Sequence, residues 1–566
     1  MPYRAAATDH QFILDHVVDF GLVSATDRFG DATPDTVSAI LTEAARLCDD
    51  VMAPLNRGGD QTPARLDNGV VRSPPGFADG YRAIAAGGWV GLAASPDYGG
   101  MGLPMAVATA VNEMMSGACL SLQLKPLLTQ GQIEALQHHA SDELKALYLP
   151  KLISGEWSGT MNLTEPQAGS DVGALRAKAE PLGNGTYAVT GQKIYITWGD
   201  CDITANHCHL VLARLPDGAP GTRGISLFMV PKFLPDAKGN PGARNSLKVV
   251  SLEHKLGIHG SPTCVMQYDG ATGWLVGGAH KGMAAMFTMM NNARLGVGAQ
   301  GVGVAEAALQ KAVAFAVDRV QGPTATGVPG IIGHAEVRRM LAEARAEVFA
   351  ARAIAAACAV AIDMASATGD ADWAARAALL TPIAKAYGTD TGCKVADIGV
   401  QVHGGMGFIE ETGAAQYLRD ARITPIYEGT NGIQAMDLVG RKLADGGAAA
   451  FALIDEIAAL ATQAQQPQPD MAASVLTATT ALRTATQAML AQDLNDRFAG
   501  AVPYLRAFAL VLGSSLHLRA AVADPARAPL ARVMITRLLP EHTALLLCSG
   551  QGAADLYALP PEVLAG

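Results

Sequence analysis

The sequence lacks the patterns that mark secreted and membrane proteins. Its eight cysteines are scattered over 566 residues without a CxxC pair, as in cytosolic proteins with reduced thiols. The first residues, MPYRAAATDHQFILDHVV, contain neither a signal-peptide apolar stretch nor an Arg- and Ser-rich transit pattern. We find no uncharged apolar run that is long enough to span a bilayer. We therefore expect a cytoplasmic protein that binds no membrane.

Charge, and basic charge above all, is scarce. The chain carries 42 Lys and Arg against 52 Asp and Glu, a net charge of −10, and no dense Lys/Arg stripe overrides this balance locally. This argues against nucleic acid as a partner, because phosphate neutralisation needs clustered cations. Charged residues make up only 17% and apolar residues 49%, far from the composition of disorder. A chain of this length is expected to form several ordered units.

No motif for a Rossmann fold, a zinc site or serine catalysis is complete. Gly296-x-Gly298-x-x-Gly301 matches the dinucleotide fingerprint, but the preceding strand and the later acidic residue are both missing. These glycines lie in a helical stretch of small residues, which favours close helix packing. His207 and His209, with Cys201 upstream, do not form a complete set of zinc ligands, so we expect no metal site there. There is no GxSxG elbow.

What is present is an ordered series of helical and β-rich segments. Helical apolar spacing begins behind Pro34, and short β-branched and aromatic runs follow, with a hairpin signal at Gly183-Asn184-Gly185. Long Ala-rich helices resume near Met283, and a polar, proline-containing linker at 465–469 divides the last Ala-rich region. The predicted parts are an N-terminal extension (1–34), an N-terminal helical domain (35–156), a central β domain (157–282), a helical bundle domain (283–445) and an additional C-terminal helical domain (446–566).

Two segments carry the residues of chemical interest. In NLTEPQAGSDVGAL, residues 164–171 form a loop whose backbone N–H groups can face an anion, although an ordinary capped turn fits the residues equally well. In RITPIYEGTNGIQAMDLVGRKL, Thr430 or Asn431 can cap a helix. Glu428 then lies just ahead of a helix N-terminus, beside Gly429, which permits close approach of another molecule. As a bare residue, Glu428 would more often serve surface electrostatics with the helix dipole.

The order of these segments resembles that of the acyl-CoA dehydrogenases. TEPQAGSD, KIYIT, RLGVGAQG with DRVQG, QVHGGMGF and IYEGTNGIQ follow one another over roughly residues 35–445. The N-terminal stretch, the wording EGTNGIQAMDLVGRKL and the C-terminal helical region most resemble the large 3-methylmercaptopropionyl-CoA dehydrogenase subgroup. The resemblance implies a mostly α fold with a central β domain: a helical domain, a β-barrel domain and a four-helix bundle, plus an extra C-terminal helical domain.

The resemblance also implies an activity, the FAD-dependent α,β-dehydrogenation of an acyl-CoA thioester to trans-2-enoyl-CoA. We expect a short-chain or 3-methylthiopropanoyl substrate, an electron-transferring flavoprotein as acceptor, and a homodimer in which residues from about 446 onward cover a surface used for tetramer assembly in smaller relatives. Glu428 is then the base that removes the α-proton; we expect burial to raise its pKa and the helix N-terminus to oppose that shift. An acyl-CoA oxidase using O2 and a DNA-associated flavoprotein of the same fold are the alternatives.

Individual residue roles follow from the same resemblance. Tyr195 stands where a tryptophan is often found, and Asn291 stands where an acidic residue is common. Arg319, Gln401, Gly404 and Gly405 would contact the FAD of a neighbouring subunit. The expected FAD-binding residues are Met161, Thr164, Ser170, Tyr195, Thr197, Arg319, Gln401, Gly404, Gly405 and Thr430; the expected substrate-binding residues are Ser170, Asn291, Arg294 and Gly429. No metal is expected.

Overall fold

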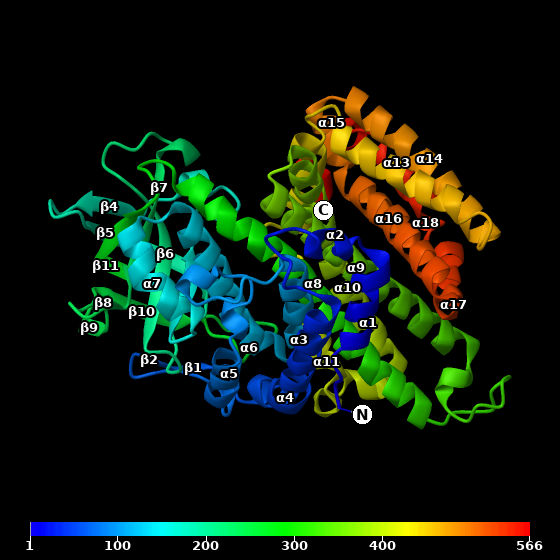
Figure 1. Cartoon of the computed structure of the whole chain (residues 1–566), viewed down its shortest axis with the longest axis horizontal. Helices are drawn as coiled ribbons and strands as arrows, with labels where there is room; N and C mark the ends of the chain where they lie inside the picture. Colours follow the sequence, from blue (N-terminus) through cyan, green and yellow to red (C-terminus); the bar gives the residue numbers. More distant parts are fainter. Residues whose placement is uncertain (1) are drawn as a thin grey trace. The chain divides into compact units, whose positions relative to one another are not determined.

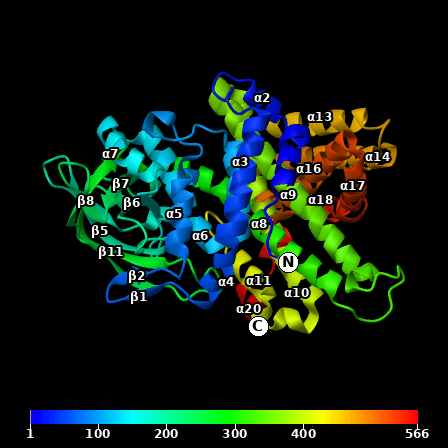
Figure 2. The ribbon, with the colours of Figure 1, turned by 60° about the horizontal axis from the view of Figure 1, so that its bottom comes forward.

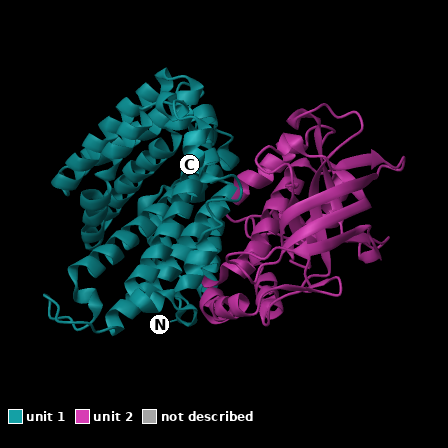
Figure 3. Cartoon of the chain, turned by 180° about the vertical axis from the view of Figure 1, so that it is seen from behind, with its two compact units in different colours: residues 1–45, 104–117, 294–566 teal, residues 46–103, 118–293 magenta. Residues whose placement is uncertain are grey.

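The computed structural model describes residues 2–566, which divide into two compact units (Figure 3). Unit 1 comprises residues 1–45, 104–117 and 294–566, and unit 2 comprises residues 46–103 and 118–293. Unit 1 is helical, whereas unit 2 contains the large sheet (Figure 1). The predicted fold class, mostly α with a central β domain, is confirmed.

Unit 2 is built on a seven-stranded sheet of order β10-β11-β5-β4-β6-β3, with β7 paired to β11 and β6. The hairpin predicted at residues 183–185 is confirmed, because β4 and β5 pair antiparallel on either side of it. Val189, Phe228 and Tyr268 belong to the buried core of this sheet. Its strands are β3 (Trp157–Asn162), β4 (Lys178–Pro181), β5 (Tyr187–Thr197), β6 (Asn206–Arg214), β7 (Ile225–Pro231), β10 (Leu247–Leu252) and β11 (Thr263–Val276). A separate two-stranded sheet is formed by β8 (Phe233–Pro235) and β9 (Pro241–Arg244).

A small β-hairpin interrupts the N-terminal region, which we had predicted to be helical from its apolar spacing. Strand β1 (Arg65–Asp67) pairs antiparallel with β2 (Val70–Arg72). Asn68 and Gly69 between them have φ of 50° and 77°, as a two-residue Asn-Gly turn requires. The helices around it are α4 (Ala53–Gln61), α5 (Phe77–Ala86), α6 (Met105–His139) and α7 (Asp142–Ile153).

Unit 1 is a set of packed helices, which Figure 2 shows from a second direction. Helix α3 starts at Pro34, as expected, and the predicted linker joins α13 to α14. The main helices are α1 (Ala7–Phe12), α2 (Phe20–Ser24), α3 (Pro34–Leu47), α8 (Gly282–Asp318), α9 (Ala335–Thr368), α10 (Ala371–His403), α11 (Ala414–Ala421), α12 (Asn431–Asp437), α13 (Ala448–Gln463), α14 (Pro469–Ala491), α15 (Leu494–Ala499), α16 (Ala501–Ala523), α17 (Ala528–Val533), α18 (Glu541–Ser549), α19 (Ala554–Tyr557) and α20 (Pro561–Ala565).

The glycines of the apparent nucleotide fingerprint form a close helix contact between α8 and α10. A Cβ placed on Gly298 would lie 2.8 Å from the carbonyl oxygen of Ala384. One placed on Gly301 would lie 2.4 Å from the carbonyl oxygen of Gly388. Because a side chain at either position would collide with backbone, only glycine permits this approach. The prediction of close helix packing is confirmed.

Within residues 2–566, three helices, α6, α9 and α16, are long and apolar enough to cross a membrane by length and composition alone. Their most apolar windows are 94%, 83% and 83% buried inside the protein, so this apolar surface is used for internal packing. Helix α16 illustrates the arrangement, because it lies against α9: the ring of His517 contacts the carbonyl oxygen of Ala346 at 2.9 Å, and a Cβ on Gly513 would lie 2.9 Å from the Cβ of Ala350.

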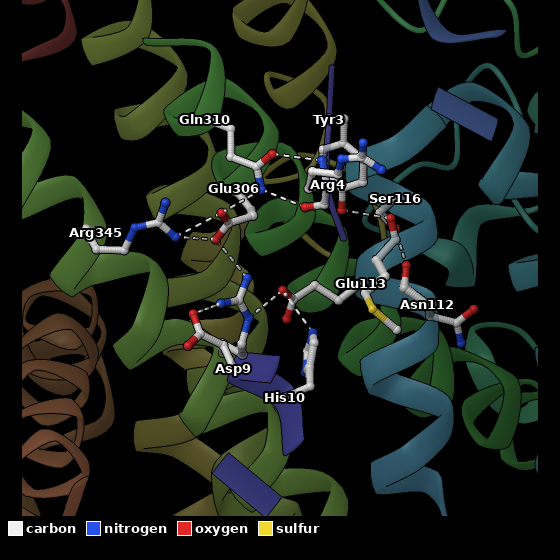
Figure 4. A network of polar contacts seen from close by, with 12 residues as sticks. Tyr3, Arg4, Asp9, His10, Asn112, Glu113, Ser116, Glu306, Gln310 and Arg345 are labelled. Atoms are coloured by element: carbon white, nitrogen blue, oxygen red, sulfur yellow. Dashed lines mark hydrogen bonds and ion pairs between the residues drawn. The ribbon is translucent and has the colours of Figure 1, made fainter. Parts of the chain in front are cut away.

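A buried ion network connects α1, α6, α8 and α9 (Figure 4). The guanidinium of Arg352 donates from Nε to Glu113 at 2.7 Å and from NH2 to Glu306 at 3.0 Å. Arg345 also pairs with Glu306 at 2.8 Å, and Asp9 lies 3.4 Å from Arg352. Burial alone would raise the pKa of Glu306, but the two arginines hold it at about 2.

We expect Arg352→Leu to destabilise the protein by roughly 3–5 kcal/mol, because buried Glu113 loses its arginine and buried Glu306 keeps only Arg345. Arg339→Leu is the control, since Arg339 pairs with Glu336 and Glu343 nearer the surface and should leave the urea midpoint nearly unchanged. The pKa of Glu306 is depressed, so its ionic contribution is complete above the unfolded value and fades as the pH falls towards 2. Equal midpoint shifts for both variants at neutral pH would contradict this interpretation.

Candidate active site

Glu428 lies in a strained turn just before α12. Its φ is +56°, a left-handed conformation that is uncommon outside glycine, and Gly429 follows at +86°. The amide Nε2 of Gln434 donates to the carbonyl oxygen of Glu428 at 3.2 Å. The ammonium of Lys385, from α10, donates to the carbonyl oxygen of Gly429 at 3.0 Å. Side chains from α12 and α10 therefore restrain the backbone of Glu428 and Gly429.

The residue that caps α12 is Thr430, one of the two predicted candidates. Its Oγ1 accepts the backbone N–H of Ile433 at 3.3 Å. Asn431 has a different role, because its Oδ1 accepts from Lys385 at 2.9 Å and its Nδ2 donates to Asp390 at 2.7 Å. Asn431 thus ties the start of α12 to α10.

Burial raises the pKa of Glu428 to about 7, against the opposing charges of Arg294 and Lys385. Arg294 is buried on α8, and its NH1 lies 3.8 Å from Asp437 of α12. From the sequence we expected the helix N-terminus to supply the opposing charge; the structure adds these two side-chain cations. A carboxyl group that is about half ionised at neutral pH is well suited to removing a weakly acidic proton.

In unit 2, the loop that follows β3 is fixed to β5 by a buried ion pair. The ammonium of Lys193 donates to Glu165 at 2.8 Å and to the carbonyl oxygen of Leu163 at 2.9 Å. Both charged side chains are buried, and burial lowers the pKa of Lys193 to about 8 although Glu165 opposes the shift. The backbone N–H of Ile194 donates to the carbonyl oxygen of Thr164 at 3.0 Å, so Thr164 is held beside β5.

Of the predicted residues of this region, Tyr195 and Thr197 lie at the end of β5, with Thr164 beside them. Tyr195 has a φ of +61° and a ring that is 61% exposed, and Thr197 follows it on the strand. Met161, on β3, is partly buried, whereas Ser170 is exposed further along the loop. An exposed aromatic ring with hydroxyl groups on both neighbouring segments fits a planar, polar-edged ligand such as an isoalloxazine ring.

A second predicted set lies in unit 1, where α8 and α10 end together. The rings of Phe315 and His403 stack with centroids 4.3 Å apart, which places Arg319 and Gln401 at the same end of the two helices. Both side chains are exposed. Gly404, with a φ of +59°, ends α10 and is followed by the exposed Gly405. An exposed arginine beside flexible backbone suits a pyrophosphate group.

Asn291 and Arg294 both lie on α8, and they differ in surroundings. Asn291 is exposed, whereas Arg294 is buried and its NH2 lies 3.9 Å from the position of a Cβ on Gly429. Three residues that support the predicted ones, Lys193, Lys385 and Gln434, were not identified from the sequence. Lys193 lies in KIYIT and Gln434 in IYEGTNGIQ, but the motifs do not show which backbone groups these side chains hold. Lys385 lies outside the quoted motifs, and its partners at Gly429 and Asn431 come from a distant segment.

Together, the two units contain the chemical groups of a flavin-dependent dehydrogenase: a platform of hydroxyls and an aromatic ring in one, and a carboxyl base with a pKa near neutrality in the other. Models of the N-terminal, middle and C-terminal domains of acyl-CoA dehydrogenases match residues 35–156, 160–271 and 280–444. The chain belongs to the acyl-CoA dehydrogenase family and is an FAD-dependent oxidoreductase.

Individual relatives agree with this assignment. The chain is 46% identical over 522 residues to a 3-methylmercaptopropionyl-CoA dehydrogenase of Ruegeria pomeroyi, which covers 89% of this chain and 88% of the relative. It is 37% identical to a butyryl-CoA dehydrogenase of Syntrophomonas wolfei over 78% of this chain and 75% of the relative. The structure of Caenorhabditis elegans ACDH-11 in complex with C11-CoA has the same fold, with a TM-score of 0.76 at 20% identity over 90% and 88% of the two chains. The predicted resemblance is confirmed.

We expect Lys193→Met to weaken FAD binding about tenfold or more, because an unpaired buried Glu165 no longer holds the Thr164 loop against β5. Lys178→Met is the matched control on the neighbouring strand, where the Lys178–Glu180 pair is exposed. Flavin fluorescence titration measures the affinity, and circular dichroism checks that both variants fold. If Lys193→Met folds and binds FAD as tightly as the control does, the Lys193–Glu165 pair does not position the Thr164 loop for FAD.

Proposed function

We propose that the protein oxidises a short-chain acyl-CoA, 3-methylthiopropanoyl-CoA or butanoyl-CoA, to the trans-2-enoyl-CoA. The choice of substrate is supported by the identity to a 3-methylmercaptopropionyl-CoA dehydrogenase over most of both chains, and by the identity to a butyryl-CoA dehydrogenase. The observation that carries the chemistry is the geometry of Glu428: a carboxyl group with a pKa of about 7, held on a rigid turn.

In this proposal Glu428 removes the α-proton of the thioester. The backbone N–H of Glu428 donates to the enolate oxygen that develops as the proton leaves. Bound FAD supplies the chemistry of the other half, because it accepts the β-hydrogen as a hydride equivalent. Gly429 leaves room for the thioester beside the base. Arg294 acts through its charge near Glu428, whereas Asn291, on the exposed part of α8, contacts the CoA moiety.

The remaining residues bind the flavin. Thr164 and Thr197 offer hydroxyls to the ring system, Tyr195 packs on its face, and Met161 lines the same edge. Ser170 reaches phosphate or the pantetheine arm from its exposed loop. The other predicted contacts, made by Thr430 and, across a subunit boundary, by Arg319, Gln401, Gly404 and Gly405, complete the proposed FAD site.

We further propose a cytoplasmic homodimer that passes electrons to an electron-transferring flavoprotein. Exposed apolar side chains next to Gly405 support a subunit contact: Met406, Phe408 and Ile409 are 51%, 87% and 45% exposed. The helices from residue 448 onward, which pack on the bundle through α16, would cover the surface that smaller relatives use for tetramer assembly. Light scattering of the purified chain tests the dimer, and a tetramer would contradict it.

We expect Glu428→Gln to retain FAD but to lower turnover by roughly 10²–10⁴-fold, because the base is lost while the side-chain size is kept. In the unsubstituted enzyme only the ionised carboxylate acts as base. With a pKa near 7, kcat should therefore rise as the pH increases through about 7 and fall below it. Substrate-dependent bleaching of the flavin, followed by stopped flow, is the measurement. Bleaching at the unsubstituted rate in the Gln variant would exclude Glu428 as the base.

A panel of acyl-CoA thioesters tests substrate and acceptor together. With an artificial electron acceptor we expect kcat/KM to be highest for 3-methylthiopropanoyl-CoA or butanoyl-CoA, and a higher value for palmitoyl-CoA would contradict the substrate proposal. Replacing the artificial acceptor with an electron-transferring flavoprotein should sustain turnover. In air without either acceptor, we expect little hydrogen peroxide; stoichiometric peroxide would instead identify an oxidase.

A further inference from the structure

We propose that Lys385 is a positioning residue of this active site, whose ammonium fixes the backbone turn that carries Glu428 and thereby the direction of its carboxylate. This inference rests on the proposed role of Glu428 as the base. Lys385 lies on α10, outside the motif that contains Glu428. The proposal follows from the two hydrogen bonds that its buried ammonium donates.

The position of Lys385 is set by the contact between α8 and α10. A Cβ on Gly298 of α8 would lie 3.2 Å from the Cα of Lys385, so the two backbones are in contact at this residue. The side chain is fully buried. Its Nζ donates to the carbonyl oxygen of Gly429 at 3.0 Å and to Oδ1 of Asn431 at 2.9 Å. The lysine thus joins α10 to both ends of the segment between Glu428 and α12.

The partners of Lys385 are unusual for a buried cation. Among residues 2–566, the structure shows no carboxylate oxygen within 4.0 Å of its Nζ, and both hydrogen-bond acceptors are neutral oxygens. Burying a charge without a paired countercharge is costly, and a neutral side chain of similar length would remove that cost. If this residue only stabilised the fold, a neutral side chain would serve better than lysine. Holding a backbone carbonyl in place while keeping a positive charge near Glu428 accounts for both features.

The turn needs such support because it is strained. Glu428, at a φ of +56°, is in the left-handed region, which is unfavourable for a residue with a side chain. Gln434 restrains the carbonyl of Glu428, and Lys385 restrains that of Gly429. Without the second restraint, the carbonyl of Gly429 keeps only the 3.5 Å contact from Nε2 of Gln434, and the direction of the carboxylate is less well fixed.

The charge of Lys385 also acts on the base. Burial raises the pKa of Glu428, and Arg294 and Lys385 lower it; burial in turn lowers the pKa of Lys385 to about 8 while Glu428 opposes that shift. The other charged or titratable groups that face this region are Arg294 on α8, Asp390 and Cys393 on α10, Asp437 on α12, Arg441 just after it, and Tyr427 beside Glu428. Since the pKa of Glu428 is lowered by Lys385, removing the ammonium should raise it further.

The test compares three variants of the FAD-loaded enzyme. Lys385→Met keeps the length and loses both the charge and the hydrogen bonds: we expect kcat to fall by roughly 10–100-fold with little change in KM, and the pH midpoint of kcat to move upward. Lys385→Arg keeps the charge but not the geometry, so the midpoint should stay near that of the unsubstituted enzyme while kcat is lowered. Lys394→Met is the control, because Lys394 lies on the same helix and pairs with Glu347 at 2.8 Å; its kcat and midpoint should be unchanged.

A second readout separates proton removal from oxidation. 3,3-Dimethylbutanoyl-CoA has α-hydrogens and no β-hydrogen, so its α-exchange in D2O reports the base alone. Exchange should be slowed in Lys385→Met and should show the same upward midpoint shift. An unchanged rate and midpoint in the folded Met variant would overturn the proposal. If that variant does not fold, Lys385→Arg decides: a lowered kcat with an unchanged midpoint supports the proposal, and an unchanged kcat overturns it. Failure of the proposed function is seen separately, as full turnover in Glu428→Gln.

Discussion

The close packing of α8 on α10 is the constraint on which the catalytic part of unit 1 depends. The contact is reciprocal: a Cβ on Gly388 would lie 2.6 Å from the carbonyl oxygen of Gly298, and one on Gly392 would lie 2.8 Å from that of Gly301. With no side chains between the helices, their residues on either side of the contact are fixed relative to each other. Lys385 and Arg294, the two cations that act on Glu428, come from these two helices. The stacked pair Phe315 and His403 extends the alignment to the helix ends.

The turn before α12 carries Glu428, and its contacts with α10 position the carboxyl group of this residue. Short helices contribute little rigidity of their own, and α12 has only seven residues. The restraint comes instead from α10, through Lys385 to the carbonyl of Gly429 and through Asp390 to Asn431. A Cβ on Gly429 would lie 2.7 Å from Nε2 of Gln434, so a side chain there would displace the amide that holds the carbonyl of Glu428. The glycine in the motif is therefore required by the packing of this turn as well as by its left-handed φ.

The sequence predicted those features that depend on local patterns. The order of motifs indicated the fold class, Thr430 had the chemistry of a cap, and the small residues around Gly298 indicated a helix contact. The β1–β2 hairpin was missed although Asn68-Gly69 is a strong turn signal, because helical periodicity on both sides dominated the interpretation. Lys193 and Lys385 could not be found in this way. Each is a lysine within an otherwise regular strand or helix, and only tertiary contacts show that its ammonium is buried.

Two glutamates in unit 1, the buried Glu306 and the half-buried Glu428, have pKa values that differ although both lie near two cations. Glu306 accepts direct hydrogen bonds from Arg345 and Arg352, and its pKa is held at about 2. Such a carboxylate stabilises the fold, but it is too weak a base to remove an α-proton. Near Glu428 the two cations are bonded elsewhere: Lys385 to backbone and amide oxygens, and Arg294 towards Asp437. Their charge restrains the effect of burial without neutralising the carboxylate, and the pKa stays at about 7. Bonding Lys385 to the carbonyl of Gly429 instead of to the carboxylate thus keeps the base both fixed in direction and basic.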